Sequence, residues 1–298
     1  MISQALPVLS WHQFGATDLA AVPIAMIVGA GLLYLYGVRR IRQLDPTRMW
    51  SSRRTAAFMG GLIVTFLAVQ SFIGLYDAVL FYDHMIQHLM LIMIAAPLFA
   101  MGAPIELLER STTGRSHDVV ARGLHSRAAG FVAHPIVDFA LYAVLIPFAH
   151  LTGFYNLTLQ HESLHDAEHL AFLVIGYLFW RHVVAIEPTR HPLHPGVRLL
   201  YLALAVPVDT FTGLALVSAS SELFSAYAQM HRAWGPSLVS DLHIGGAVMW
   251  VGGDTLMLLA MIPVAIQWLH EDERRAQVFD MQIEPEPARE LASIYGPG

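Results

Sequence analysis

Long apolar stretches separated by short polar segments run along the whole chain. Most are about twenty residues long, which is enough for an α-helix to cross a hydrocarbon core of roughly 30 Å. The pattern predicts an all-α polytopic membrane protein, a bundle of seven transmembrane helices at about Leu19–Val38, Ala56–Tyr76, Phe81–Met101, Pro135–Leu151, His161–Trp180, Leu199–Ser218 and Ser240–Trp268. It divides the chain into a short outer N-terminal segment (1–18), the transmembrane domain (19–269) and a polar, loosely structured cytoplasmic tail (270–298). Residues 1–18 contain no Lys or Arg, so they lack the basic start of a cleaved signal peptide.

Arginine marks one side of the predicted bundle. Clusters of arginine follow the first, third and fifth spans, whereas loop 152–160, before the fifth span, has no basic residue. By the positive-inside rule the clusters lie in the cytoplasm, which places the amino terminus outside and the carboxyl terminus inside. Arg232 is then the only basic residue in a predicted outer loop. His182, His191 and His194 share an inner loop with arginines, and we interpret them as ordinary interfacial polar residues.

Composition supports a membrane protein and restricts its chemistry. Of the 298 residues, 55% are hydrophobic and 13% charged, whereas roughly a quarter of the residues of a soluble domain are charged. Cysteine is absent, so disulfides, thiolate metal sites and thiol catalysis are excluded. Any metal must therefore be held by histidine, methionine or carboxylate. We expect the lipid bilayer as a partner and no nucleic acid.

The outer ends of the predicted spans are rich in histidine. His84 and His88 open the third span, and His165 and His169 open the fifth. The members of each pair are four residues apart, so they lie about 6 Å apart on one helical face and can share a metal ion. Because the third, fifth and seventh spans run in the same direction, their first turns lie at one level. The predicted metal-binding residues at this level are His84, His88, His150, His161, His165, His169 and His243.

Acidic and thioether side chains accompany these histidines. Asp83, Glu168 and Asp241 lie near the starts of the same spans, where they offset the positive end of the helix dipole and can orient imidazole rings. Met85 and Met90 lie beside the first histidine pair. Imidazole together with thioether suits copper, Cu(I) in particular. Zinc, held by imidazole and carboxylate, is the alternative.

Two further acids lie inside the predicted spans. Asp209 is near the middle of the sixth span and Asp254 near the middle of the seventh, each about 15 to 17 Å deep at 1.5 Å per residue. An acid in a membrane is costly, which favours a functional interpretation. One prediction is that the two carboxyl groups approach and share a proton. The other is that each bonds a neighbouring hydroxyl, from Thr210, Thr212 or Thr255.

Four fragments resemble the CtaG-type cytochrome c oxidase assembly factors, a seven-span bacterial family. They are His84–Leu89, Ala96–Pro104, His165–Trp180 and Gly245–Trp250, and the resemblance extends over about residues 15 to 270. It implies a multi-pass protein of the bacterial inner (plasma) membrane that helps haem-copper oxidases mature by supplying copper. The partners implied are the oxidase subunit that carries a copper centre and an extracytoplasmic copper donor. The positions that match the family are His84, His88, His165, Glu168, His169, Asp241 and Trp250.

The family pattern has a glutamine after the aspartate that opens the last span, where this chain has Leu242 and His243. Three functions of different classes follow from the sequence. The favoured one is a non-enzymatic copper-binding assembly factor. The second is a membrane haemoprotein or quinone-linked oxidoreductase, because paired histidines on membrane helices also ligate haem. The third is a copper or proton-coupled transporter, for which Asp209 and Asp254 are the relevant residues.

Overall fold

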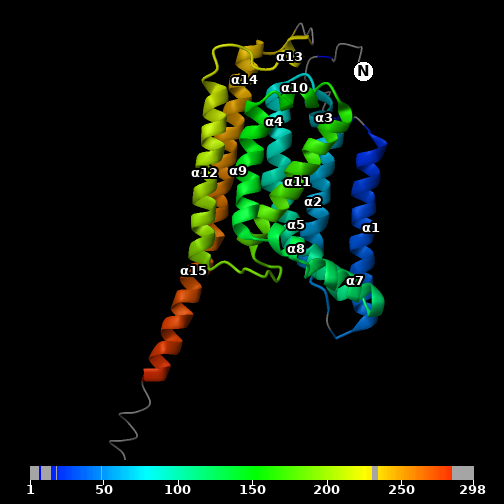
Figure 1. Ribbon diagram of the computed structural model, residues 1–298, viewed down its shortest axis with the longest axis vertical. Helices are drawn as coiled ribbons and strands as arrows, with labels where there is room; N and C mark the ends of the chain where they lie inside the picture. Colours follow the sequence, from blue (N-terminus) through cyan, green and yellow to red (C-terminus); the bar gives the residue numbers. More distant parts are fainter. Residues whose placement is uncertain (1–6, 8–14, 18, 48, 230–233, 284–298) are drawn as a thin grey trace, which may run out of the picture.

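The fold is a bundle of long helices that run side by side (Figure 1). The computed structural model describes residue 7 and residues 15–17, 19–47, 49–229 and 234–283, with side chains up to residue 279. Its helices are α1 (Ala21–Leu44), α2 (Ser52–Gln70), α3 (Phe72–Tyr76), α4 (Phe81–Leu89), α5 (Ala96–Gly102), α6 (Pro104–Ser111), α7 (Gly114–Leu124), α8 (Arg127–Val132), α9 (Pro135–Leu151), α10 (Phe154–Thr158), α11 (Glu162–Val184), α12 (Pro195–Val217), α13 (Ser225–Gln229), α14 (Leu238–Ala247) and α15 (Gly253–Ile283). Two π-helical segments, η2 (Met90–Ala95) and η3 (Val248–Gly252), join α4 to α5 and α14 to α15. The described residues contain no strand, which confirms the all-α class.

Each predicted span falls on a helix of this bundle. Five helical stretches are long and apolar enough to cross a membrane, namely Ala21–Leu44, Ser52–Tyr76, Phe81–Ser111, Pro195–Val217 and Leu238–Phe279. The predicted fourth span is the shorter apolar helix α9, and the predicted fifth is α11, whose first turns carry several charged residues. The total of seven crossings and the orientation of the termini therefore stay predictions.

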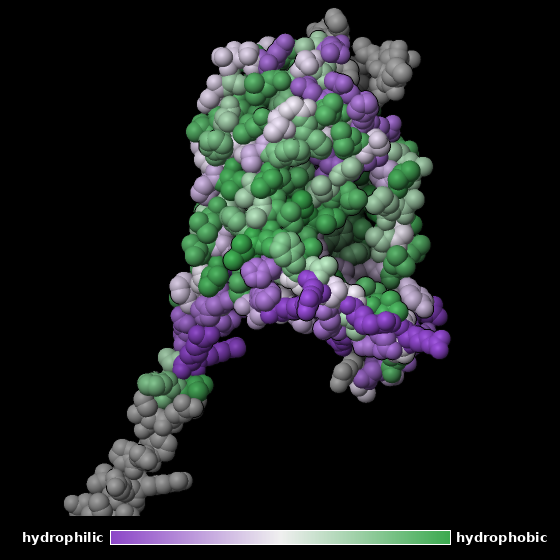
Figure 2. Space-filling view, in the orientation of Figure 1, coloured by the Kyte–Doolittle hydropathy of each residue, from purple (hydrophilic) through white to green (hydrophobic). Residues whose placement is uncertain are grey.

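The surface of the bundle is suited to lipid. Large apolar side chains face outward along its length, with Leu33 73%, Ile136 72% and Phe211 66% exposed. Figure 2 shows the result, an apolar middle between hydrophilic ends. A soluble monomer rarely exposes so continuous an apolar surface. The described chain is thus a membrane-spanning helical protein.

Proline and glycine shape the third span. Pro97 has no N–H, so the carbonyl of Met93 lacks its usual α-helical partner. The Ala96 N–H bonds the carbonyl of Leu91, five residues back, and the turns before the proline form η2. The helix ends at Gly102, one residue beyond the predicted end of the third span, because Ala103 adopts a left-handed φ of 49° and Pro104 starts α6.

The last helix is longer than the sequence predicts. Residues 270–283 were expected to be loosely structured, but they continue α15 beyond the bundle (Figure 1). They contain no proline or glycine, and Gln267 donates a hydrogen bond to Glu271 one turn on. Polarity alone therefore does not end a helix here. The rest of the predicted tail, and most of the predicted segment 1–18, lie outside the described residues.

Candidate metal centre

Contacts between helices bring the histidine-bearing turns together at one end of the bundle. Asp241 of α14 accepts hydrogen bonds from the backbone N–H groups of Phe81 (3.2 Å) and Tyr82 (3.1 Å), and so caps the start of α4. Gly176 lets α11 approach the third span, because a Cβ there would lie 2.9 Å from the side chains of Ile92 and Ala96. α4 and α11 therefore carry their histidine pairs to the same place.

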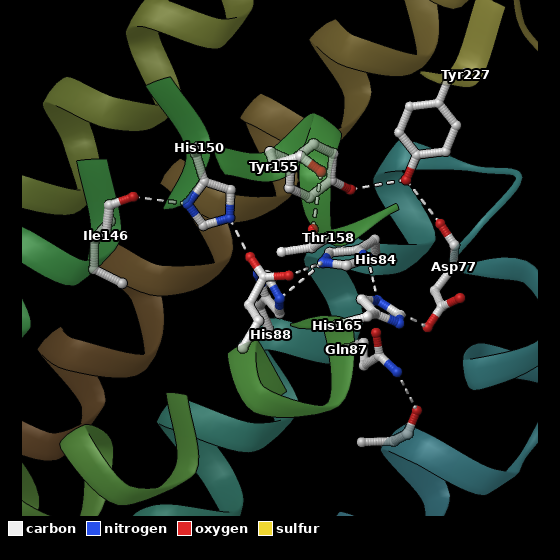
Figure 3. Close-up of polar contacts among 12 residues, drawn as sticks. Asp77, His84, Gln87, His88, Ile146, His150, Tyr155, Thr158, His165 and Tyr227 are labelled. Carbon is white, nitrogen blue, oxygen red and sulfur yellow. Dashed lines mark hydrogen bonds and ion pairs between the residues drawn. The ribbon is translucent and has the colours of Figure 1, made fainter. Parts of the chain in front are cut away.

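Four imidazoles form a connected row (Figure 3). The Nε2 atoms of His84 and His88 are 2.8 Å apart. His88 Nδ1 is 3.1 Å from His150 Nε2 of α9, and His165 Nε2 of α11 is 3.4 Å from His84 Nδ1. The sequence predicted that His84, His88 and His165 lie at one level, with His150 at a similar depth, and the structure brings these four rings together.

Hydrogen-bond partners fix the tautomers of the neutral rings in this row. His150 Nδ1 must donate to the carbonyl oxygen of Ile146, 2.8 Å away, so its Nε2 carries a lone pair toward His88. His88 Nδ1 then donates to His150, and His88 Nε2 accepts from His84 Nε2. Each shared proton lies between two nitrogens that could both bind metal. A metal ion would replace such a proton, because metal binding requires deprotonated ligands.

His169 completes the group, and it has a free ligand atom. Its ring lies 4.2 Å from that of His165, 5.7 Å from His84 and 5.8 Å from His88. Its side chain is buried, and its Nε2 has no hydrogen-bond partner among the described residues. A buried polar atom without a partner is costly and rare. We call His84, His88, His150, His165 and His169 the histidine cluster.

Two carboxylates lie close to the histidine cluster. Glu168 Oε2 is 3.8 Å from His84 Nε2, and Asp77 Oδ2 is 3.7 Å from His165 Nε2. Two groups of side chains have ligand atoms within 4.8 Å of one another: Asp77 with His84, His165 and His169, and Glu168 with His84 and His88. Glu168 was predicted from the sequence. Asp77 was missed, and its signal was a position in the short outer loop directly before the first histidine pair.

Aromatic residues close the histidine cluster toward the nearer end of the bundle. Tyr155 of α10 donates to the hydroxyl of Tyr227 of α13 at 2.8 Å, because Tyr227 itself donates to the carbonyl of Asp77 at 2.7 Å (Figure 3). Burial raises the pKa of both phenols well above its usual value, which keeps them neutral. Phe172 stacks on His88 from below, with ring centroids 3.9 Å apart. The cluster is thus bordered by aromatic rings as well as by the carboxylates of Asp77 and Glu168.

Two predicted ligands lie apart from the histidine cluster. His243 Nε2 bonds the backbone carbonyl of Ala219 at 2.8 Å, on another side of α14 from the capping Asp241. Residues two positions apart in a helix point in directions about 200° apart. The side chain of His243 therefore cannot point toward α4 as that of Asp241 does. His161 is the exposed N-cap residue of α11. The positions of His243 and His161 along their spans therefore predicted their level in the bundle but not the direction of their side chains.

The other predicted residues have separate surroundings. Asp241 serves as the cap of α4, as described above. Asp83 is buried beside His84, and its Oδ2 has no hydrogen-bond partner among the described residues. Met85 is buried and borders a cavity next to His88, whereas Met90 is partly buried against the core at the start of η2.

The intramembrane acids are held by hydroxyl groups. Tyr142 of α9 donates to both carboxylate oxygens of Asp209, at 2.9 and 2.8 Å. Thr210 donates to Asp254 at 2.7 Å. The prediction that each acid bonds a hydroxyl group therefore agrees with the structure. Asp254 bonds Thr210, as the sequence indicated, whereas Asp209 bonds Tyr142, which the sequence did not indicate.

One inner histidine is not an ordinary interfacial residue. His182 Nε2 lies 2.8 Å from Asp138 Oδ2, and both side chains are fully buried. The interpretation from the neighbouring arginines was wrong because it considered the sequence around His182 and not the helix packed against it. Asp138 lies in the first turn of α9, which runs antiparallel to α11 beside it (Figure 1).

Comparison with known proteins places this arrangement in a family. The model of the cytochrome c oxidase caa3 assembly factor family matches residues 32–271. An uncharacterized protein of Mycobacterium leprae is 26% identical over 260 residues, which cover 85% of this chain and 39% of the relative. An uncharacterized protein of Mycobacterium tuberculosis is 28% identical over 286 residues, which cover 93% of this chain and 42% of the relative.

The chain thus spans about two fifths of the length of these curated relatives. No solved structure matches it. The family match, however, extends from within α1 to within α15 and includes every residue of the histidine cluster. On that extent, the chain belongs to the cytochrome c oxidase caa3 assembly factor family.

Proposed function

We propose that this protein binds copper in the histidine cluster and supplies it to a haem-copper cytochrome c oxidase during assembly. The observation that carries the proposal is the free Nε2 of His169, which is buried where one ion could reach it together with His84, His165 and Asp77. The aromatic side chains that border the cluster suit an ion of low charge. Cu(I) is such an ion, and imidazole is one of its ligands.

The role is transfer of metal, with no catalytic step. In this proposal the chain crosses the bacterial inner membrane seven times, with the amino terminus outside. The histidine cluster then lies at the outer face, where it would receive copper from an extracytoplasmic donor. The oxidase subunit that carries the copper centre would be the acceptor. Asp77 and Glu168 would compensate the charge of the ion.

The packing of the histidine and phenylalanine rings leaves no room for haem. His88 is stacked on Phe172 at 3.9 Å, and its ring lies 4.2 Å from that of His84. A porphyrin requires an open slot between two facing imidazoles, and neighbouring rings fill that space here. The geometry therefore favours a bare ion.

The test combines metal content with oxidase maturation. Protein purified in detergent from copper-replete cells should contain copper, little zinc and no haem absorption. Cells without the gene should contain oxidase subunits that lack copper and activity. Copper-loaded oxidase in those cells would contradict the supply role. A haem spectrum from the purified protein would contradict the proposal that copper is the bound group.

A further inference from the structure

A small cavity lies directly inside the histidine cluster, toward the middle of the bundle. Its volume of about 10 Å³ is about that needed for one water molecule or ion. His88 and His150 form part of its wall, so the cavity and the cluster share two imidazoles. Asp209 is the other polar residue that borders the cavity, and Tyr142 holds its carboxylate in place.

Three methionines line this cavity, each from a different segment. Met85 comes from α4, Met93 from η2 and Met249 from η3. Apart from His88, His150 and Asp209, the rest of the wall is apolar, and the lining contains no hydroxyl or amide side chain. Thioether sulfur with imidazole is a ligand set that selects Cu(I) over harder cations. Methionine also fills gaps in ordinary cores, so the convergence needs a second observation.

The helical geometry provides that observation. Within the described residues π-helix occurs in two segments, and both contribute a methionine to this cavity. A π-helical turn is rare, costs regular hydrogen bonding and is found mostly at functional sites. Pro97 explains why η2 forms, but no proline follows η3 within its own turn, so η3 needs another reason. Two such segments beside one cavity favour a site that is built for a ligand.

Charge favours the same conclusion. A cation deep in a helical bundle needs a compensating negative charge. Asp209 borders the cavity and supplies a carboxyl group close to it. Cu(I) carries a single positive charge, which one carboxylate can balance.

We propose that this cavity is a second, deeper Cu(I) site, formed by Met85, Met93, Met249 and His150. It accepts the ion from the histidine cluster through the two imidazoles that the sites share. This inference rests on the proposed function, because it needs copper to reach the cluster first. It adds a thioether step inside the bundle, which gives the protein two positions for copper along one path.

The absence of cysteine makes a direct test available. In a chain without cysteine, any sulfur bound to copper must belong to methionine. X-ray absorption at the copper edge of the Cu(I)-loaded, detergent-purified protein should therefore show sulfur as well as nitrogen neighbours. Exchange of Met93 and Met249 for leucine conserves volume and is well tolerated in cores. The double variant should bind about one copper ion fewer per chain and lose most of the sulfur signal.

Met257→Leu is the matched control. Met257 is fully buried in α15 but does not border the cavity, so this variant should keep both copper and sulfur. Copper with only nitrogen and oxygen neighbours in the wild type would overturn the second site and leave the proposed function standing. A wild type that binds no copper would overturn both. A double variant with unchanged copper content and sulfur signal would overturn the assignment of Met93 and Met249.

Discussion

Asp241 is the residue for which the structure changes the interpretation most, from a neighbour of the metal to a helix cap. Its carboxylate accepts two hydrogen bonds from α4, at Phe81 and Tyr82, across 160 and 159 residues of chain. The side chain is 1% exposed, so water cannot replace it. Asp241→Ala would leave two backbone N–H groups without that acceptor.

The expected loss follows from these two bonds. A hydrogen bond to a charged group contributes about 1.5–3 kcal/mol, and removal of a single helix cap costs about 0.5–2 kcal/mol. We expect Asp241→Ala to lower the free energy of unfolding by about 2–4 kcal/mol. Asp241→Asn keeps one oxygen acceptor but not the charge, so its loss should be roughly half as large.

Thermal unfolding in detergent, with copper content measured on the same samples, provides the assay. Unfolding midpoints should rank Asp241→Ala lowest, Asp241→Asn next, and the control Ser240→Ala, at an exposed neighbour, close to wild type. Asp241→Asn should keep its copper, because Asp241 is in neither group of converging ligand atoms. An unchanged midpoint in Asp241→Ala would refute the cap. Loss of copper from a stable Asp241→Asn would make Asp241 part of the metal site.

Three further predictions concern topology, pH and a buried pair. Exposed cysteines introduced at Ser51 and Gln160 should react with an impermeant reagent from opposite sides of the membrane, and labelling of both from outside would contradict the orientation. Burial raises the pKa of Glu187, in the loop after α11, above its usual value of 4.5. The contribution of Glu187 to stability is therefore complete below pH 4.5 and is lost as the pH rises through the pKa of the folded state. Glu187→Gln should remove that part of the pH dependence of the unfolding midpoint, and an identical slope would count against it. His182→Ala should cost about 3–5 kcal/mol, measured by unfolding, because it strands the buried Asp138 carboxylate; Asp138→Asn in the same background should restore part of the loss.

Hydrophobic length and residue spacing predicted the parts of the fold that depend on one helix at a time. The boundaries of α9 agree with the predicted fourth span, and the two histidine pairs share faces because four residues make about one turn. That these pairs lie at one level followed from the alternating direction of consecutive spans. These results need no knowledge of which helices are neighbours.

The remaining features depend on neighbours and on rotation about each helix axis. The position of His243 along its span predicted the correct level, but its ring bonds the carbonyl of Ala219, away from the histidine cluster. Tyr142 contacts Asp209 from a helix 67 residues earlier, and no spacing rule indicates such a pair. Asp77 lies in a loop, where no periodicity gives a direction. The sequence therefore predicted the layer of the site but not its full membership.

The central claim is that the histidine cluster binds copper, and its test is copper stoichiometry in matched histidine variants. His88→Ala and His169→Ala should each abolish stoichiometric copper, because a two- or three-coordinate Cu(I) site cannot lose an imidazole. His243→Ala should keep its copper, since that ring bonds a backbone carbonyl elsewhere, and His161→Ala should only weaken uptake from its exposed position. Full copper content in folded His88→Ala and His169→Ala would contradict the account.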